Sequence, residues 1–226
     1  LLASILKTSP LVLFSLKSSN INSVKDFKNK KIMINEEQTG TIALKAMLHS
    51  QDVNFKNLHI FKRSYNIQDL ISGKIDIMPG YISDKGFILH KKEVAYNTFN
   101  PSTYGFEFYE DILFTSNNEL NLNPQRVENF RKASLKGWKY AFDNMEETVS
   151  LILKKYNTQK KTKEAYLYEA NVLKKLAFNN NDELGNINKN KILDIYNVYH
   201  ILGFIKKKIN LKNFLYQKPK NNRVVF

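Results

Sequence analysis

The chain has 226 residues, which is enough for one large domain or for two lobes with an apolar core. Hydrophobic residues make up 42% of it and charged residues 25%, which argues against wholesale disorder. It contains no cysteine, and this excludes disulfide bonds, thiolate metal sites and cysteine nucleophiles.

The formal net charge of +14 raises the question of nucleic-acid binding. The lysines are scattered near expected element ends and turns among many asparagines, with few arginines and no recognisable nucleic-acid motif. We therefore expect solvated surface lysines and no nucleic-acid partner. No stretch approaches the roughly 18 apolar residues that suggest a membrane span, so we expect no membrane insertion in this segment.

The apolar N-terminus is interrupted by Lys7 and Pro10, lacks a basic leader and begins without Met. It is typical of strand material and not of a signal peptide. Because the chain opens within expected core strands, we expect a fragment or a processed form. The first two strands are predicted at 1–7 and 11–17, with a break at Ser9-Pro10, where proline removes a ladder donor.

The chain to residue 99 then alternates short strands with helices. Strands are expected at 31–35, 58–63, 74–78 and 94–99, and helices at 42–51, 66–72 and 83–90. This alternation predicts an α/β fold with a parallel sheet covered on both faces. Ligands of such sheets collect at the carboxyl ends of strands, where residues 35–40 and 79–81 lie. Tyr81 is therefore a candidate site residue.

Thr39, Gly40 and Thr41 separate the strand at 31–35 from the helix at 42–51. In this layout, backbone N–H groups at the helix start point toward a bound anion or polar ligand. A threonine here also serves as an ordinary helix cap, and we favour that simpler interpretation.

The densest aromatic run is YGFEFYEDILFTS, residues 104–116. Its period-two pattern predicts a strand, with Phe106, Phe108 and Glu110 on one face and Glu107, Tyr109 and Asp111 on the other. Acids and tyrosines beside large apolar rings suit a strand that lines a ligand cleft. An ordinary sheet strand with solvated acids fits the local pattern as well.

The remaining chain predicts helices at 125–143, 146–156, 163–177 and 189–202, the last ended by Gly203, and a terminal amphipathic piece at 210–216. Trp138 falls on the apolar stripe of the first helix and is expected in the core.

The chain shows no catalytic set and no cofactor motif. The four histidines are separated, without a metal-type partner, and there is no phosphate loop, nucleophile elbow or dinucleotide fingerprint. Glu107 and Asp111 would lie roughly 13 Å apart on a strand, too far for a shared acid-base pair. Binding is therefore favoured over turnover, with no metal and no cofactor.

The segments SPLVLFSL, VKDFKNKKIMI, GKIDIMPGYIS, YGFEFYEDILFTS and FRKASLKGWKYAF, in this order, resemble the thiamine-pyrimidine-precursor-type periplasmic binding proteins. They resemble especially the branch that forms sensor domains of bacterial histidine kinases and diguanylate cyclases. The resemblance implies a type II periplasmic-binding-protein fold, in which two α/β lobes are joined by crossing hinge strands. Residues 1–18 and 104–226 would form a helix-rich first lobe with hinge strands, lacking its N-terminal part, and residues 19–103 the complete second lobe.

The resemblance also implies a ligand site between the lobes. Tyr81, Tyr104 and Tyr109 would wall a ring, Glu107, Thr39 and Gly40 would offer hydrogen bonds, and Ser9 and Asp111 complete the set, Asp111 alternatively fixing the hinge. At residues 83–86 the chain departs from the family pattern, so Asp84 is not included.

The implied function is extracytoplasmic binding of a small heterocyclic ligand, such as a thiamine pyrimidine precursor, by hinge closure. The implied partners are an ABC permease or a fused membrane signalling domain. The alternatives are a truncated module that acts through protein contacts and an enzyme of pyrimidine synthesis.

Overall fold

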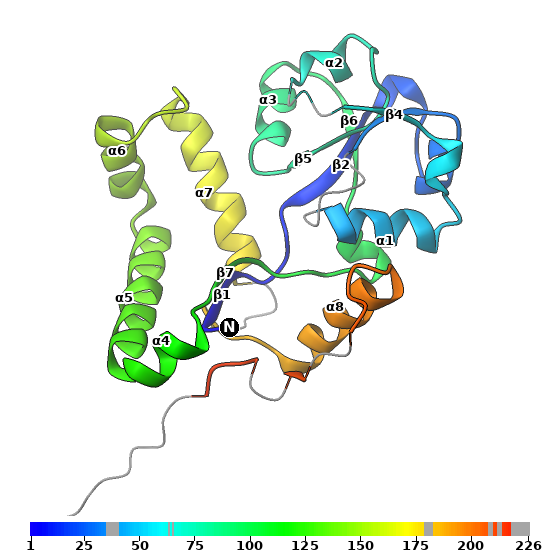
Figure 1. The fold of residues 1–226 in the computed structure, drawn as a ribbon. Helices are drawn as coiled ribbons and strands as arrows, with labels where there is room; N and C mark the ends of the chain where they lie inside the picture. Colours follow the sequence, from blue (N-terminus) through cyan, green and yellow to red (C-terminus); the bar gives the residue numbers. More distant parts are fainter. Residues whose placement is uncertain are drawn as a thin grey trace, which may run out of the picture.

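The computed structural model describes residues 1–34, 41–62, 64, 66–178, 183–207, 210–211 and 214–217. It is a mixed α/β structure with a sheet-containing lobe on one side and a lobe dominated by helices on the other (Figure 1). Thr39 and Gly40, both predicted to contact ligand, lie outside the described residues.

The sheet-containing lobe is organised around β2 (Leu11–Leu16). This strand pairs antiparallel with β5 (Met78–Tyr81) on one side and with β6 (Tyr96–Phe99) on the other. β3 (Lys31–Met33) pairs in parallel with β4 (His59–Phe61), and a parallel bridge between Ile32 and Ile77 connects β3 to the chain entering β5. Three helices belong to this part of the chain: α1 (Ile42–Ser50), α2 (Gln68–Ile71) and α3 (Lys85–Lys91).

Two details of this lobe differ from the sequence prediction. The prediction of an all-parallel sheet is wrong, because β2 enters from the neighbouring lobe and runs against both of its partners. The strand expected at 74–78 instead begins at Met78 and continues through Pro79 and Gly80. Proline is tolerated here because β5 is an end strand of the three-stranded sheet, where a residue without an N–H donor does not have to bridge two neighbouring strands.

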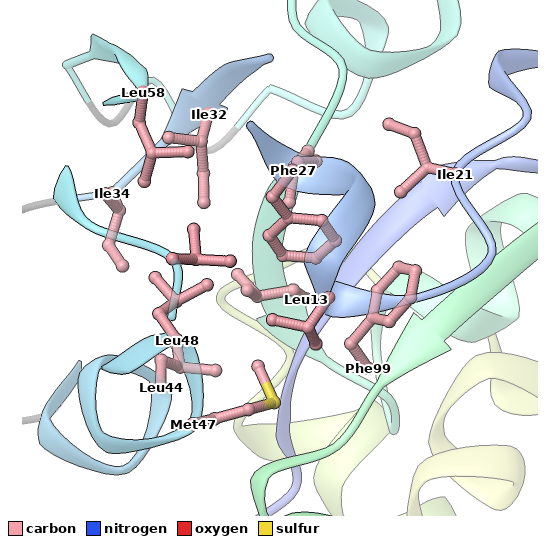
Figure 2. Packing of buried hydrophobic residues seen from close by; sticks show 13 residues of the cluster. Leu13, Ile21, Phe27, Ile32, Ile34, Leu44, Met47, Leu48, Leu58 and Phe99 are labelled. Atoms are coloured by element: carbon pink, nitrogen blue, oxygen red, sulfur yellow. The ribbon is translucent and has the colours of Figure 1, made fainter. Parts of the chain in front are cut away.

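The core of this lobe contains a large apolar cluster between the sheet strands and α1. Leu13, Phe27 and Leu44 are completely buried in it, and the rings of Phe27 and Phe99 meet edge to face with centroids 4.8 Å apart (Figure 2). Fully buried leucine and phenylalanine side chains each contribute roughly 1.5–3 kcal/mol through removal from water. This cluster therefore fixes α1 against the sheet.

The helical lobe is built on a two-stranded antiparallel pair, β1 (Ala3–Leu6) with β7 (Glu110–Leu113). Ile5 and Leu6 form an apolar cluster with Phe142 and Ala177, against which Trp138 packs as predicted. The predicted helices of this lobe begin and end close to their predicted limits: α5 (Pro124–Asp143), α6 (Met145–Lys155), α7 (Lys163–Ala177) and α8 (Lys189–Ile201). A further short helix, α4 (Asn117–Leu122), is not among the predicted ones.

Two segments cross side by side between the lobes, at residues 7–10 and 105–109. The Ser9 N–H donates to the Phe108 carbonyl oxygen at 2.9 Å. The apolar clusters divide on either side of this crossing, with Leu13 of β2 and Tyr104 on the side of the sheet-containing lobe. The predicted domain boundaries remain a proposal.

The continuous strand predicted at 104–116 is wrong. Tyr104 ends a 3-10 turn, Pro101–Tyr104, and only Glu110–Leu113 is strand. Gly105 and Asp111 both have positive φ, +89° and +52°, and a left-handed residue breaks period-two alternation. Across the described residues, no helix combines the length and apolar character needed to cross a membrane.

Candidate ligand-binding site

A cavity of about 290 Å³ lies at the crossing of the two lobes. The first crossing segment contributes Thr8 and Ser9, α1 contributes Ala43 near its first turn, and α8 contributes Tyr199. The second crossing segment and the start of β7 form most of the remaining wall, with Phe106, Phe108 and Tyr109 from the first and Glu110, Asp111 and Ile112 from the second. Apolar walls with a few aimed polar groups are typical of small-molecule sites.

Glu110 is the centre of the polar side of this cavity. Its carboxylate accepts hydrogen bonds from the Ser9 hydroxyl and, at 3.1 Å, from the Tyr81 hydroxyl. The negative charge of Glu110 also acts on Tyr199, whose pKa is raised first by burial and then by this charge. Tyr199 therefore stays protonated at neutral pH and can donate a hydrogen bond.

Asp111 is the second carboxylate of the cavity. Among the described residues, no hydrogen bond or ion pair involves its side chain, unlike that of Glu110. The residue is exposed, yet neighbouring atoms desolvate the carboxylate and raise its pKa above the ordinary aspartate range. Its φ of +52° is uncommon for a residue with a side chain, and such outliers concentrate at ligand sites.

Glu107, in contrast, is engaged by the protein itself. It accepts a hydrogen bond from Thr8 Oγ1 and pairs with Lys191 Nζ at 2.9 Å. The same ammonium lies 4.5 Å from the centroid of the Tyr109 ring, and Tyr109 is buried. Glu107 thus holds α8 against the crossing segments and does not line the 290 Å³ cavity.

The structure brings together four of the predicted site residues. Ser9, Tyr109 and Asp111 line the cavity, and Tyr81 reaches it through its hydrogen bond to Glu110. Tyr104 packs against the apolar core of the sheet-containing lobe and is absent from the cavity wall. Thr41 occupies the N-cap position of α1 without a side-chain capping hydrogen bond, and Thr39, the other threonine predicted as a cap, lies outside the described residues.

Three residues of the cavity wall were not predicted from the sequence: the central carboxylate, Glu110, and two aromatic side chains, Phe108 and Tyr199. Under strict alternation, Glu110 and Phe108 fall on the strand face opposite to Asp111, so a regular strand could not present all three to one cavity. The positive φ of Asp111 lets consecutive residues face the same cavity. Tyr199 carries no local signal, because it lies about 90 residues further along the chain.

Asp84, which the sequence analysis left out, lies away from this cavity. It pairs with Lys85 at 3.2 Å and with Lys161 at 3.3 Å, and it therefore serves the contact between α3 and the loop before α7.

The NMT1/THI5-like family profile matches residues 1–148, about two thirds of the chain. The chain belongs to the NMT1/THI5-like family. The match includes both crossing segments, the cavity carboxylates and helices α1 to α5, and it ends before α8. The sequence resemblance is thereby confirmed at the level of the family, whereas the sensor branch remains a prediction.

A similar protein is the formylaminopyrimidine-binding protein of Halalkalibacterium halodurans, 24% identical over 113 residues, which are 49% of this chain and 34% of that protein. The chain therefore matches about a third of the length of this relative.

Solved structures of the periplasmic sulfonate-binding protein SsuA share the fold. SsuA from Methylobacillus flagellatus KT superposes with a TM-score of 0.67 at 18% identity, covering 96% of this chain and 66% of SsuA. The aliphatic sulphonate binding protein SsuA from Escherichia coli gives 0.68 at 11% identity, covering 96% and 69%. The periplasmic-binding-protein fold predicted from the sequence is confirmed.

Proposed function

We propose that this NMT1/THI5-like chain is a non-catalytic binding protein for a small nitrogen heterocycle, such as a thiamine pyrimidine precursor. The two lobes would close on the ligand at the crossing segments, as hinge-bending proteins do. The chain's similarity to a formylaminopyrimidine-binding protein supports this ligand class.

The observation that carries the proposal is the charge of the cavity. Within a chain of net charge +14, the described cavity wall contains Glu110 and Asp111 but no lysine or arginine. Carboxylates accept hydrogen bonds from amino groups, and aromatic side chains pack against a flat ring. An aminopyrimidine offers both features, and its size suits a cavity of about 290 Å³.

The same charge disfavours an anionic ligand, although the structurally similar SsuA proteins are named for sulfonates. A sulfonate in this cavity would meet two carboxylates without a described basic side chain to offset them. Unpaired like charges in a partly desolvated site weaken binding and act against the wrong ligand.

Closure of the two lobes around the ligand could be recognised by either partner predicted from the sequence, an ABC permease or a fused signalling domain. The structural neighbours favour the permease, because SsuA of M. flagellatus is described as part of a sulfonate ABC transporter. Location outside the cytoplasm follows from this role. Among the described residues that line the cavity there is no histidine, which favours binding over the alternative of a pyrimidine-synthesis enzyme.

Replacement of Glu110 by Gln tests the proposal. The substitution keeps the shape but removes the charged acceptor that Ser9 and Tyr81 orient. Hydrogen bonds to charged groups contribute roughly 1.5–3 kcal/mol, so we expect formylaminopyrimidine affinity to fall about ten- to hundredfold by calorimetry. Glu93→Gln, at an exposed acid on the other lobe, is the control and should bind as wild type does. Equal affinity of Glu110→Gln and wild type would place the ligand elsewhere.

A further inference from the structure

Helix α8 lies beyond the family-matched region, yet it is attached to both crossing segments. Lys191 Nζ donates to the Lys7 carbonyl oxygen at 2.6 Å and pairs with Glu107 at 2.9 Å. The backbone N–H of Asn188, the cap residue of α8, donates to the Tyr109 hydroxyl at 2.9 Å. The start of α8 therefore holds a fixed position relative to the hinge.

The other end of α8 places one side chain, Tyr199, in the cavity wall. Its ring stacks on Phe108 with a centroid distance of 6.0 Å and an interplanar angle of 21°. On another side it meets Phe204 edge to face at 6.4 Å. Phe204 in turn lies 4.8 Å from the ammonium of Lys45, on α1 of the sheet-containing lobe.

These contacts connect Tyr199 to a crossing segment and to the sheet-containing lobe. Phe108 belongs to the crossing segment, and the Phe204–Lys45 contact reaches α1. Because Phe108 and Tyr199 both line the cavity, their stacked rings form one continuous aromatic wall beside Glu110. A phenol next to a carboxylate can donate to it or to a ligand acceptor, as the ligand requires.

We infer that Tyr199 is a specificity-determining ligand contact, that α8 covers the cavity, and that Lys191 fixes the position of α8 there. The inference rests on the proposed function and deepens it. The cover selects planar heterocycles, since a flat ring packs on the Phe108–Tyr199 wall more fully than an aliphatic chain does. Specificity for this ligand class thus depends on a helix outside the family-matched residues.

The test compares three variants with wild type by calorimetry against formylaminopyrimidine. Base–aromatic packing contributes roughly 1–3 kcal/mol per ring, so Tyr199→Ala should weaken binding about ten- to hundredfold. Tyr199→Phe keeps the stacking and removes the hydroxyl, and should weaken binding about three- to tenfold. Lys191→Met releases the start of α8 and should therefore also weaken binding.

Tyr196→Ala is the matched control, because Tyr196 stacks on His200 of the same helix at 6.0 Å and does not line the cavity. It should bind within about twofold of wild type, as expected for a substitution away from the site. Hydrogen exchange on the wild-type chain gives a second measurement, in which formylaminopyrimidine should protect residues 189–201.

The outcomes separate the two proposals. If the wild-type chain binds formylaminopyrimidine, both Tyr199 variants bind it with the same affinity and α8 is not protected, the inference about Tyr199 and α8 is wrong. The proposed function then still stands. Absence of binding by the wild-type chain would overturn the proposed function, and this inference with it. A loss in Tyr196→Ala equal to that in Tyr199→Ala would show that only the stability of α8 matters, which also contradicts a ligand contact.

Discussion

At the scale of single residues, Asp111 combines three properties that rarely coincide without a role. It has a φ of +52°, its carboxylate has no partner among the described side chains, and desolvation raises its pKa. Its position also interrupts the pairing of β1 with β7, where Ile5 would otherwise meet it. A group held in an unfavourable state is typical of sites that gain their partner from a ligand.

We expect Asp111→Asn to stabilise the ligand-free chain and to weaken formylaminopyrimidine binding. Asparagine tolerates positive φ and carries no charge to desolvate. Because the folded pKa of Asp111 is raised, the charged form opposes folding once the pH rises past the ordinary aspartate pKa. The Tm of Asp111→Asn should therefore exceed the Tm of wild type by a margin that increases with pH. The increase should fall between the pKa of Asp111 in the unfolded chain and its higher pKa in the folded chain.

Asp52→Asn is the control, since Asp52 has a similar φ of +57° but lies outside the cavity. Asp52→Asn should bind formylaminopyrimidine as wild type does. A Tm of Asp111→Asn below that of wild type at neutral pH would contradict this account of Asp111.

The same residue shows how far the sequence pattern extends. Alternation predicts that residues 104–116 line a cleft, and the family resemblance adds Tyr109 and Asp111, both of which line the cavity. Neither of them selects Glu110, because the positive φ at Asp111 brings both carboxylates to one cavity and a strictly alternating strand would separate them.

At the scale of elements, α3 and α7 make a second contact between the lobes, apart from the crossing segments. Lys161, just before α7, pairs with Asp84 at 3.3 Å and with Glu169 at 3.0 Å. The rings of Phe87 and Tyr168 lie 5.3 Å apart. Gly86 permits this approach, since a Cβ there would lie 3.3 Å from the Tyr168 hydroxyl.

We expect Lys161→Met to destabilise the chain by roughly 1–3 kcal/mol, because it leaves two partly buried carboxylates without their shared cation. The pKa of Lys161 is raised because its two ion pairs outweigh the burial that opposes the charge. The measurement is urea denaturation, with hydrogen exchange of α3 as the local measure.

Lys163→Met is the matched control, because Lys163 pairs with Glu146 at 2.7 Å through side chains that are both more than half exposed. Such surface pairs contribute about 0–1 kcal/mol. Equal destabilisation by the two substitutions would show that the α3–α7 contact contributes nothing specific.

The elements also divide into those that sequence predicts well and those that it does not. The helices of the second half follow their apolar periodicity closely, and Thr162 and Asn188 cap α7 and α8 with their side chains. The strands are displaced or reversed where pairing partners decide, as for β5 and β2, because a long-range partner carries no local signal.

At the scale of the whole molecule, family and fold could be predicted from the order of several modest segments, none of which is specific alone. The family match and the SsuA superpositions confirm both. The charge of the cavity could not be predicted, because the cavity wall is assembled from distant parts of the chain: both crossing segments, β7, α1 and α8. That charge, opposite in sign to the chain's net +14, is the reason why we propose a nitrogen heterocycle and not a sulfonate as the ligand.

Calorimetric titration of the wild-type chain with formylaminopyrimidine and, in parallel, with ethanesulfonate tests this central claim most directly. We expect saturable binding of the pyrimidine, which weakens as the pH falls and Asp111 is protonated, and no measurable binding of the sulfonate. Saturable binding of ethanesulfonate, or a pyrimidine titration without heat at every temperature tried, would contradict it.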